Sequence, residues 1–276
     1  MAGPRVTVGN VEIVALLDTP MEFDWAMFFP NNPRSDFDPY AELYPEAYAA
    51  SGKFGTNAQC YALRSQGKTL LVDTGIGPGP IAFLGGIRGR LVEDMRAKGV
   101  PPDGVDVVVF THLHGDHVGW SLTAEGAPTF PNARYYVPQE DWDFFSQALS
   151  ANPQMGQILP LKDTGVLELF SGEIALTDEV TTYPTPGHTP GHTSLMVSSS
   201  GERALIAGDL AHHPAQVERT DWCSGFDGDP AKAIESRGKA FDLVEADGLL
   251  AAMCHFPQPG FGKLVRLEGK RVFQAL

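Results

Sequence analysis

The sequence predicts a single α/β domain that spans residues 1–276. Strand-like and helix-like segments alternate along the chain, which is typical of α/β proteins. The composition, 43% hydrophobic and 20% charged residues, lies in the globular range. A chain of 276 residues can bury a sizeable core without disulfide bonds. No short-period repeat and no low-complexity linker divides it, so one domain is expected.

The expected strands are short runs of apolar and β-branched residues. In the first half of the chain they cover residues 11–17, 59–63, 69–72, 105–110 and 134–137. In the second half they cover residues 194–197, 204–207 and 249–254, followed by a terminal hairpin over 264–272. The runs at 105–110 and 249–254 are almost continuously apolar, which is typical of strands covered on both faces.

Three helices are expected between these strands. Residues 91–98 form a short helix that Gly99 ends, with Pro101 beyond it. Residues 139–149 show a helical pattern, and residues 231–245 follow Asp229-Pro230, an N-cap residue with proline at the first helical position.

Residues 18–55 form a long segment that is rich in proline and aromatic residues and weakly periodic. A loop of this length inside a compact domain is usually functional or covers something. The apolar side chains between Met21 and Phe29 could form a lid over the site that selects a substrate with an apolar portion. They could equally form the interface of a homodimer.

The formal net charge of −14 argues against nucleic acids and anionic membranes as partners. A negative field repels phosphate backbones and anionic headgroups, so we expect neither nucleic acid nor a membrane as partner. Cys60, Cys223 and Cys254 have no Cys-x-x-Cys spacing, which argues against a disulfide framework. The first residues lack the apolar region of a signal peptide, so a cytoplasmic location is expected.

The strongest chemical signal is the run His112-Leu113-His114-Gly115-Asp116-His117, which directly follows the apolar strand 105–110. In extended backbone, residues i and i+2 point to the same side, so His112 and His114 can converge on one ion. Asp116 and His117 follow a glycine that permits a sharp turn. Four potential ligands in six residues at a strand end indicate a metal site.

Three further candidates follow in order. His188 lies in the rigid segment Thr185-Pro186-Gly187-His188-Thr189-Pro190-Gly191-His192, Asp209 follows the strand 204–207, and His255 follows the strand 249–254.

Together these residues resemble the motif of the metallo-β-lactamase superfamily, over residues 69–256. The resemblance implies an αββα sandwich, in which two mixed β-sheets are flanked by helices and the site lies at one edge. It also implies that His112, His114 and His188 bind one metal, that Asp116, His117 and His255 bind a second, and that Asp209 bridges both. His192 would be structural, and Asp73 would accept a hydrogen bond from a ligand histidine.

This ligand set implies a dinuclear metal-dependent hydrolase with two divalent ions, zinc being the first candidate and iron, manganese or cobalt the alternatives. Paired ions about 3.5–4 Å apart can share a hydroxide that attacks an ester-like bond of a small-molecule substrate. Asp116 and His212 are the candidate catalytic residues, while His213 is expected to line the pocket rim. Cys254 is expected to be a small buried residue that strand alternation turns away from the site.

The ending His255-Phe256-Pro257-Gln258-Pro259-Gly260 is similar to the methyl parathion hydrolase branch. Acyl-homoserine lactonases share the seven-ligand pattern but commonly carry tyrosine where this chain has His212. We expect a lactone or a carboxyl ester as the first candidate substrate and a phosphotriester as the second. A thioester substrate and a non-catalytic metal-binding module are further alternatives.

Overall fold

Two sheets form the centre of the molecule. The computed structural model describes residues 3–276, and within them the strands form two seven-stranded sheets. In spatial order the first contains β1 (Arg5–Val8), β2 (Val11–Phe23), β3 (Phe54–Ser65), β4 (Lys68–Val72), β5 (Val107–Val109), β6 (Arg134–Pro138) and β7 (Leu167–Phe170). The second contains β14 (Lys270–Ala275), β13 (Phe261–Leu267), β12 (Leu250–Ala252), β11 (Glu202–Ile206), β10 (Thr193–Ser199), β9 (Val180–Pro184) and β8 (Ala175–Thr177).

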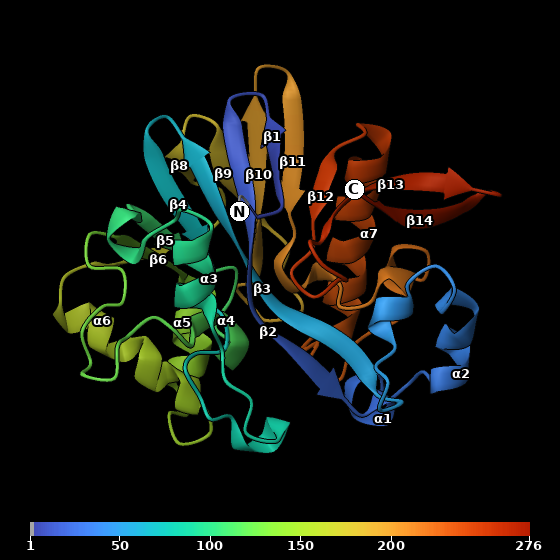
Figure 1. Ribbon diagram of the computed structural model, residues 1–276, viewed down its shortest axis with the longest axis horizontal. Helices are drawn as coiled ribbons and strands as arrows, with labels where there is room; N and C mark the ends of the chain where they lie inside the picture. Colours follow the sequence, from blue (N-terminus) through green and yellow to red (C-terminus); the bar gives the residue numbers. More distant parts are fainter. Residues whose placement is uncertain (1–2) are drawn as a thin grey trace.

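Helices cover the outer faces of both sheets (Figure 1). α3 (Leu91–Ala97), α5 (Gln139–Ser146) and α6 (Leu159–Asp163) lie on the first sheet, and α7 (Pro230–Ala246) lies on the second. The short helices α1 (Trp25–Phe28) and α2 (Arg34–Phe37) lie at the end of β2 and β3, and α4 (Gly115–Val118) contains part of the 112–117 run at the edge of the sheets. One hydrophobic cluster lies between the sheets, a second lies beneath α3, α5 and α6, and a third lies beneath α7 and the 21–54 segment. This arrangement confirms the predicted αββα sandwich.

Parallel strand pairs set the edge that carries the site. β4 to β7 run parallel to one another in the first sheet and β11 runs parallel to β12 in the second, whereas the other neighbours are antiparallel. Because parallel strands end at the same edge of a sheet, Asp73 and the 112–117 run emerge together from the first sheet. Asp209 and His255 emerge together from the second. The strand ends of the two sheets lie at the same edge and meet there, since His117 Nε2 is 3.1 Å from Asp209 Oδ1.

Most expected elements are present with small shifts at their ends. Asp229 caps α7 as predicted, since its side chain accepts a hydrogen bond from the Lys232 backbone N–H at 3.0 Å. The strand expected at 105–110 is only Val107–Val109, because the chain leaves the sheet to enter the histidine loop. The sequence does not predict four of the strands, because they are short and contain polar residues; these are β1, β7, β8 and β9.

The 18–55 segment differs from the expected loop. β2 continues to Phe23, α1 and α2 follow, and β3 begins at Phe54. Its aromatic side chains are mostly buried within the same chain, whereas Met27 is 50% exposed. The possible dimer interface stays a prediction, which light scattering at micromolar concentration would test.

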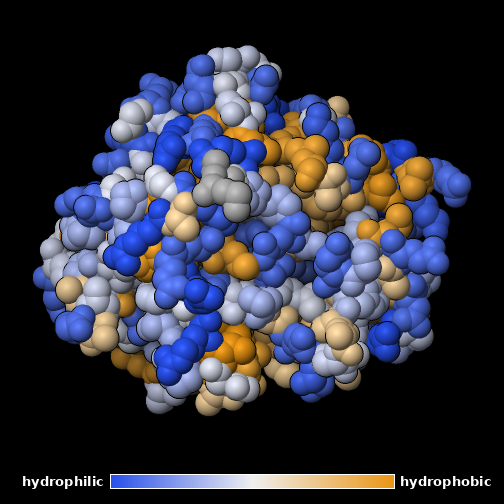
Figure 2. All heavy atoms as spheres, viewed as in Figure 1, coloured by the Kyte–Doolittle hydropathy of each residue, from blue (hydrophilic) through white to orange (hydrophobic). Residues whose placement is uncertain are grey.

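The three cysteines are free and buried. No helix within residues 3–276 is long and apolar enough to span a bilayer. On the face drawn in Figure 2, hydrophilic residues predominate and hydrophobic residues gather in separate groups, one of them on the side of the C-terminal hairpin β13–β14.

Candidate metal centre

Seven residues from four separate segments meet at the edge between the sheets. Atoms of His112, His114, His188 and Asp209 all lie within 4.8 Å of one another. Atoms of Asp116, His117 and His255 form a second group by the same measure. The structure thus separates the candidate ligands into the two sets that the sequence resemblance implies.

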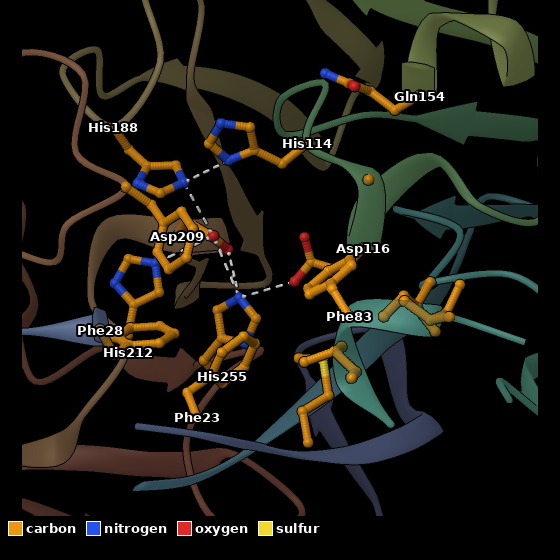
Figure 3. A pocket seen from close by; sticks show the side chains of 16 residues that line it. Phe23, Phe28, Phe83, His114, Asp116, Gln154, His188, Asp209, His212 and His255 are labelled. Atoms are coloured by element: carbon orange, nitrogen blue, oxygen red, sulfur yellow. Dashed lines mark hydrogen bonds and ion pairs between the residues drawn. The ribbon is translucent and has the colours of Figure 1, made fainter. Parts of the chain in front are cut away.

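Asp209 lies between the two sets. Its Oδ2 is 3.1 Å from His188 Nε2 and 3.6 Å from His112 Nε2, whereas its Oδ1 is 3.1 Å from His117 Nε2. His255 Nε2 is close to both oxygens, at 3.1 Å from Oδ1 and 3.2 Å from Oδ2. In Figure 3, the rings of His114 and His188 approach Asp209 from one side and His255 from the other, with Asp116 beside His255. A carboxylate in this position can bridge two ions.

Three histidine rings are held from outside by acceptor groups. His117 Nδ1 donates to Asp73 Oδ2 at 2.9 Å, and His188 Nδ1 donates to Asp227 Oδ1 at 2.8 Å. His255 Nδ1 donates to the Asn57 backbone carbonyl at 2.7 Å. A neutral imidazole has only one N–H, so each of these rings presents a lone pair on Nε2 to the interior of the site.

The facing nitrogens fit divalent cations. His114 Nδ1 lies 3.1 Å from His112 Nε2 and 2.9 Å from His188 Nε2, although a neutral ring cannot donate to both. His117 Nε2 is buried, and although Asp209 Oδ1 lies 3.1 Å away, the two atoms are not aligned for a hydrogen bond. Converging lone pairs and a carboxylate are the donor set that zinc and related ions prefer.

Asp73 supports both halves of the 112–117 loop. Besides accepting from His117, its carboxylate accepts from the Thr111 backbone N–H and from Thr111 Oγ1, each at 2.8 Å. Thr111 Oγ1 in turn lies 3.0 Å from His112 Nδ1. Asp73 has a φ of +63°, which aspartate tolerates better than most residues. This is the orienting position that was expected for it.

Sequence reasoning missed a buried ion pair behind His188. Asp227, which accepts from His188, also accepts from Arg237 Nη2 at 3.1 Å. Arg237 lies in α7, is fully buried, and donates to the Leu210 carbonyl beside Asp209 at 2.7 Å. From sequence alone, an arginine in the middle of an amphipathic helix is expected to be solvated. Only the burial of Arg237 in the structure identifies its ion pair with Asp227.

Two further residues tie the histidine loops together. His192 Nε2 accepts from the Asp209 backbone N–H at 2.9 Å, which supports its structural role. Asp141 in α5 accepts from Leu113 N at 3.0 Å and from Gly191 N at 2.6 Å, so it joins the first histidine loop to the second. Burial raises the pKa of Asp141 to about 6. Nothing in the sequence around Asp141 indicated this contact.

Electrostatics favour a charged Asp209. Burial opposes its ionisation, but His117 and His255 hold the pKa of its carboxyl well below the usual range. Burial also opposes a charged His188, yet Asp209 and Asp227 raise the pKa of that ring to about 9. Without metal, protons therefore take the place of cations beside these carboxylates.

Members of both sets, namely His114, Asp116, His188, Asp209 and His255, form the floor of a cavity of about 280 Å³. Its other walls are mainly apolar. They are formed by Met21, Phe23, Phe28, Ile76, Ile81, Phe83, Leu84 and Phe226. No lysine or arginine lines this cavity in the part of the chain that the structure describes. An uncharged ligand with an apolar portion suits such a space.

His212 lines the cavity, and its Nε2 lies 3.2 Å from Asp209 Oδ2. Burial lowers the pKa of His212 to about 4 despite the nearby carboxylate, so the ring is neutral near pH 7. Its Nδ1 is buried without a hydrogen-bond partner. The side chain thus touches both the candidate bridging residue and the substrate space.

Two expectations are wrong. His213 does not line the pocket rim but is fully buried among aromatic rings that include Trp25, Phe37 and Phe54. Cys254 is buried, but it is not turned away, because its Sγ lies 3.3 Å from Asp209 Oδ1. β12 ends at Ala252, so strand alternation no longer applies at Cys254.

An αββα sandwich with histidines and aspartates gathered at one edge of its sheets defines a metallo-hydrolase. The sequence pattern of the metallo-beta-lactamase superfamily matches residues 54–255. The chain belongs to this superfamily, which confirms the resemblance inferred from its motifs.

Two other proteins resemble this chain in sequence over more than two thirds of its length. The uncharacterized protein YobT of Bacillus subtilis (strain 168) is 28% identical over 227 residues, which cover 79% of this chain and 88% of the relative. An N-acyl homoserine lactonase of Bacillus thuringiensis is 26% identical over 205 residues, covering 68% of this chain and 76% of the relative.

Solved structures are similar over the full length. The hydrolase AbOPH of the beta lactamase superfamily has a TM-score of 0.85 at 26% identity, covering 100% of this chain and 98% of that one. The dizinc quorum-quenching lactonase AidC has a TM-score of 0.86 at 20% identity, covering 100% and 97%. The second likeness speaks for the fold alone.

Proposed function

We propose that the protein is a dinuclear metal-dependent hydrolase that cleaves an ester bond, with a lactone or a carboxyl ester as substrate. The observation that carries this proposal is the position of Asp209, which presents one oxygen to each of the two ligand sets at the floor of an apolar cavity. His112, His114 and His188 would hold one ion, Asp116, His117 and His255 the other. Two bound divalent ions supply Lewis-acid activation of water and of the substrate's oxygen.

The cavity supports an uncharged substrate with an apolar extension. Met21, Phe23 and Phe28 from the 18–55 segment form part of the wall, which supports a substrate-binding role for that segment. Ile81 and Phe83 form another part of the wall. The N-acyl homoserine lactonases among the relatives act, by their name, on a substrate of this kind. A phosphotriester is also uncharged, and the ending 255–262 favours it as the second candidate.

Removal and return of metal tests the centre. Protein stripped with a chelator should lose hydrolysis of every ester, and it should regain activity as about two ions per chain are restored. Zinc, manganese, cobalt and iron should be compared by mass spectrometry of metal content together with a panel of lactones, aryl esters and phosphotriesters. Full activity with a single ion per chain would contradict the dinuclear mechanism. Two bound ions without hydrolysis of any panel member would favour a non-catalytic module.

We propose that His212 donates a hydrogen bond to the substrate or its leaving group. His212→Ala should lower kcat by about 100-fold or more, because a positioned donor or acid is worth at least that much. Metal content should stay unchanged, since the seven proposed ligands remain. Gln154→Ala is the control, because Gln154 lines the same cavity but lies apart from Asp209 and His212 (Figure 3). Unchanged kinetics in His212→Ala would remove the role.

A further inference from the structure

Residues 76–90, between β4 and α3, form a loop that we call the flap. It closes on itself, since Ile81 N donates to Ile87 O and Gly89 N donates to Gly77 O, both at 2.9 Å. Its side chains Ile76, Ile81, Phe83 and Leu84 form one wall of the cavity, although Phe83 is 75% exposed. The position of the flap therefore sets the shape of the substrate space.

Asp18 holds both ends of the flap. Its Oδ2 accepts from Ile76 N at 2.6 Å and from Gly77 N at 3.3 Å. Its Oδ1 accepts from Leu91 N, just past the flap, at 2.7 Å. The Asp18 backbone carbonyl accepts from Arg90 N at 3.0 Å. Asp18 is 2% exposed, and all these partners are N–H groups of the backbone.

The surrounding chain is built for this contact. Pairing of β2 with β3 shifts register between Leu17 and Thr19, so Asp18 lies in a bulge that can redirect its side chain. A Cβ atom on Gly75 or Gly89 would come within 2.3 Å of an Asp18 carboxylate oxygen. Glycine at both ends of the flap therefore permits the close approach.

The same carboxylate also contacts the metal-binding loop. Oδ1 accepts from the indole Nε1 of Trp120 at 3.0 Å, two residues past α4, which carries Asp116 and His117. Asp18 thus joins the flap to the segment that presents two candidate metal ligands. Loss of this anchor would move the apolar wall relative to the reacting centre.

We propose that Asp18 is a positioning residue for substrate selectivity, which holds the flap so that its apolar side chains bind the apolar portion of the substrate. This inference rests on the proposed esterase function. It concerns the flap and makes Asp18 neither a metal ligand nor a group that touches the reacting atoms.

The test is Asp18→Asn in the metal-loaded protein. Asparagine has the same shape, but its NH₂ group faces two N–H donors and cannot accept from them. Amide exchange within residues 76–90 should accelerate by about 10-fold or more, because a buried charge-assisted anchor is lost. KM should rise about 10-fold or more for esters with a long apolar portion and stay unchanged for short ones. Metal content should not change.

Asp94→Asn is the matched control, because the Asp94 carboxylate accepts from Leu17 N at 2.8 Å, beside Asp18 on the same strand, and from Lys98 Nζ at 2.6 Å. Its bond to the flap runs from its backbone N–H to Arg90 O, which the substitution leaves in place. Its flap exchange and KM values should match the wild type. If Asp18→Asn does not fold, Gly89→Ala keeps Asp18 and displaces the flap, and it should show the same two changes. In a Phe83→Ala background, Asp18→Asn should raise KM little further.

The outcomes separate the two proposals. If the wild type hydrolyses short and long esters and Asp18→Asn leaves their KM ratio or the flap exchange unchanged, the selectivity role is overturned while the proposed function stands. Loss of metal, or an equal rise in both KM values, would assign Asp18 a structural role instead. If the wild type hydrolyses no ester, the proposed function fails and the selectivity role fails with it, whatever the exchange data show.

Discussion

Asp209→Ala should remove metal from both halves of the centre and abolish ester hydrolysis. Asp209 Oδ2 lies 3.1 Å from His188 Nε2 and Oδ1 lies 3.1 Å from His117 Nε2, so this one side chain contacts both ligand sets. A group that merely orients a ligand is typically worth about 10–100-fold in metal affinity or activity, and loss of a shared ligand should exceed that range. Metal affinity should be measured by competition with a chelator and activity with the preferred ester.

Asp116→Ala is the comparison that gives this result its meaning. Asp116 Oδ2 lies 3.7 Å from His117 Nε2 and 3.7 Å from His255 Nε2, on the second set only. This variant should therefore keep about one ion with near-normal affinity, whereas Asp209→Ala should keep neither. An Asp209→Ala protein that retains two tightly bound ions would show that Asp209 is not a bridge. Circular dichroism with and without chelator would report whether both variants remain folded.

Arg237→Met should destabilise the metal-free protein by about 3–5 kcal/mol, which is the usual effect of breaking a buried ion pair, even though His188 Nδ1 still donates to Asp227. The guanidinium donates to the carbonyls of Leu210, Thr220 and Trp222 as well as to Asp227, and methionine replaces none of these bonds. Each buried carbonyl that loses its donor adds to the loss. Denaturant unfolding of the metal-free protein measures the effect.

Arg203→Met is the matched control, since Arg203 forms an ion pair with Asp247 at 2.6 Å in which both side chains are more than one third exposed. Its loss should change stability by no more than about 1 kcal/mol. Arg237→Met should also weaken metal binding at the set that contains His188, because Asp227 would no longer be held in place. A change in stability no larger than that of Arg203→Met would contradict this account of the pair.

The sequence was most informative where ligands are close along the chain. His112, His114, Asp116 and His117 follow one apolar strand, so local geometry alone places them together. His188, Asp209 and His255 lie far apart along the chain, and only the superfamily resemblance joined them to the site. The structure brings Asp209 and His255 to the same edge because the parallel pair β11–β12 ends there, and it brings His188 there in the loop between the antiparallel strands β9 and β10.

The remaining misses share a physical origin. Cys254, His213 and Asp227 are ordinary residues by local pattern, and what distinguishes them is the partner that the fold places beside each one. The sequence predicts a loop over residues 18–55, because the apolar side chains of this segment do not lie on one face of a single helix or strand. They are buried instead by contacts with distant elements of the fold. Such contacts leave no periodic signal in the sequence.

The sequence alone therefore determined the superfamily and the αββα class, through the resemblance of its motifs, and it named the histidines and aspartates that carry the candidate chemistry. The tertiary structure decided how that chemistry is presented. It oriented the imidazole rings through Asp73, Asp227 and the Asn57 carbonyl, paired Asp227 with Arg237, and placed Asp18 beneath the flap. These contacts join residues that are remote in the chain, so they form only after the sheets have packed together and the entropy of closing the long loops between them has been lost.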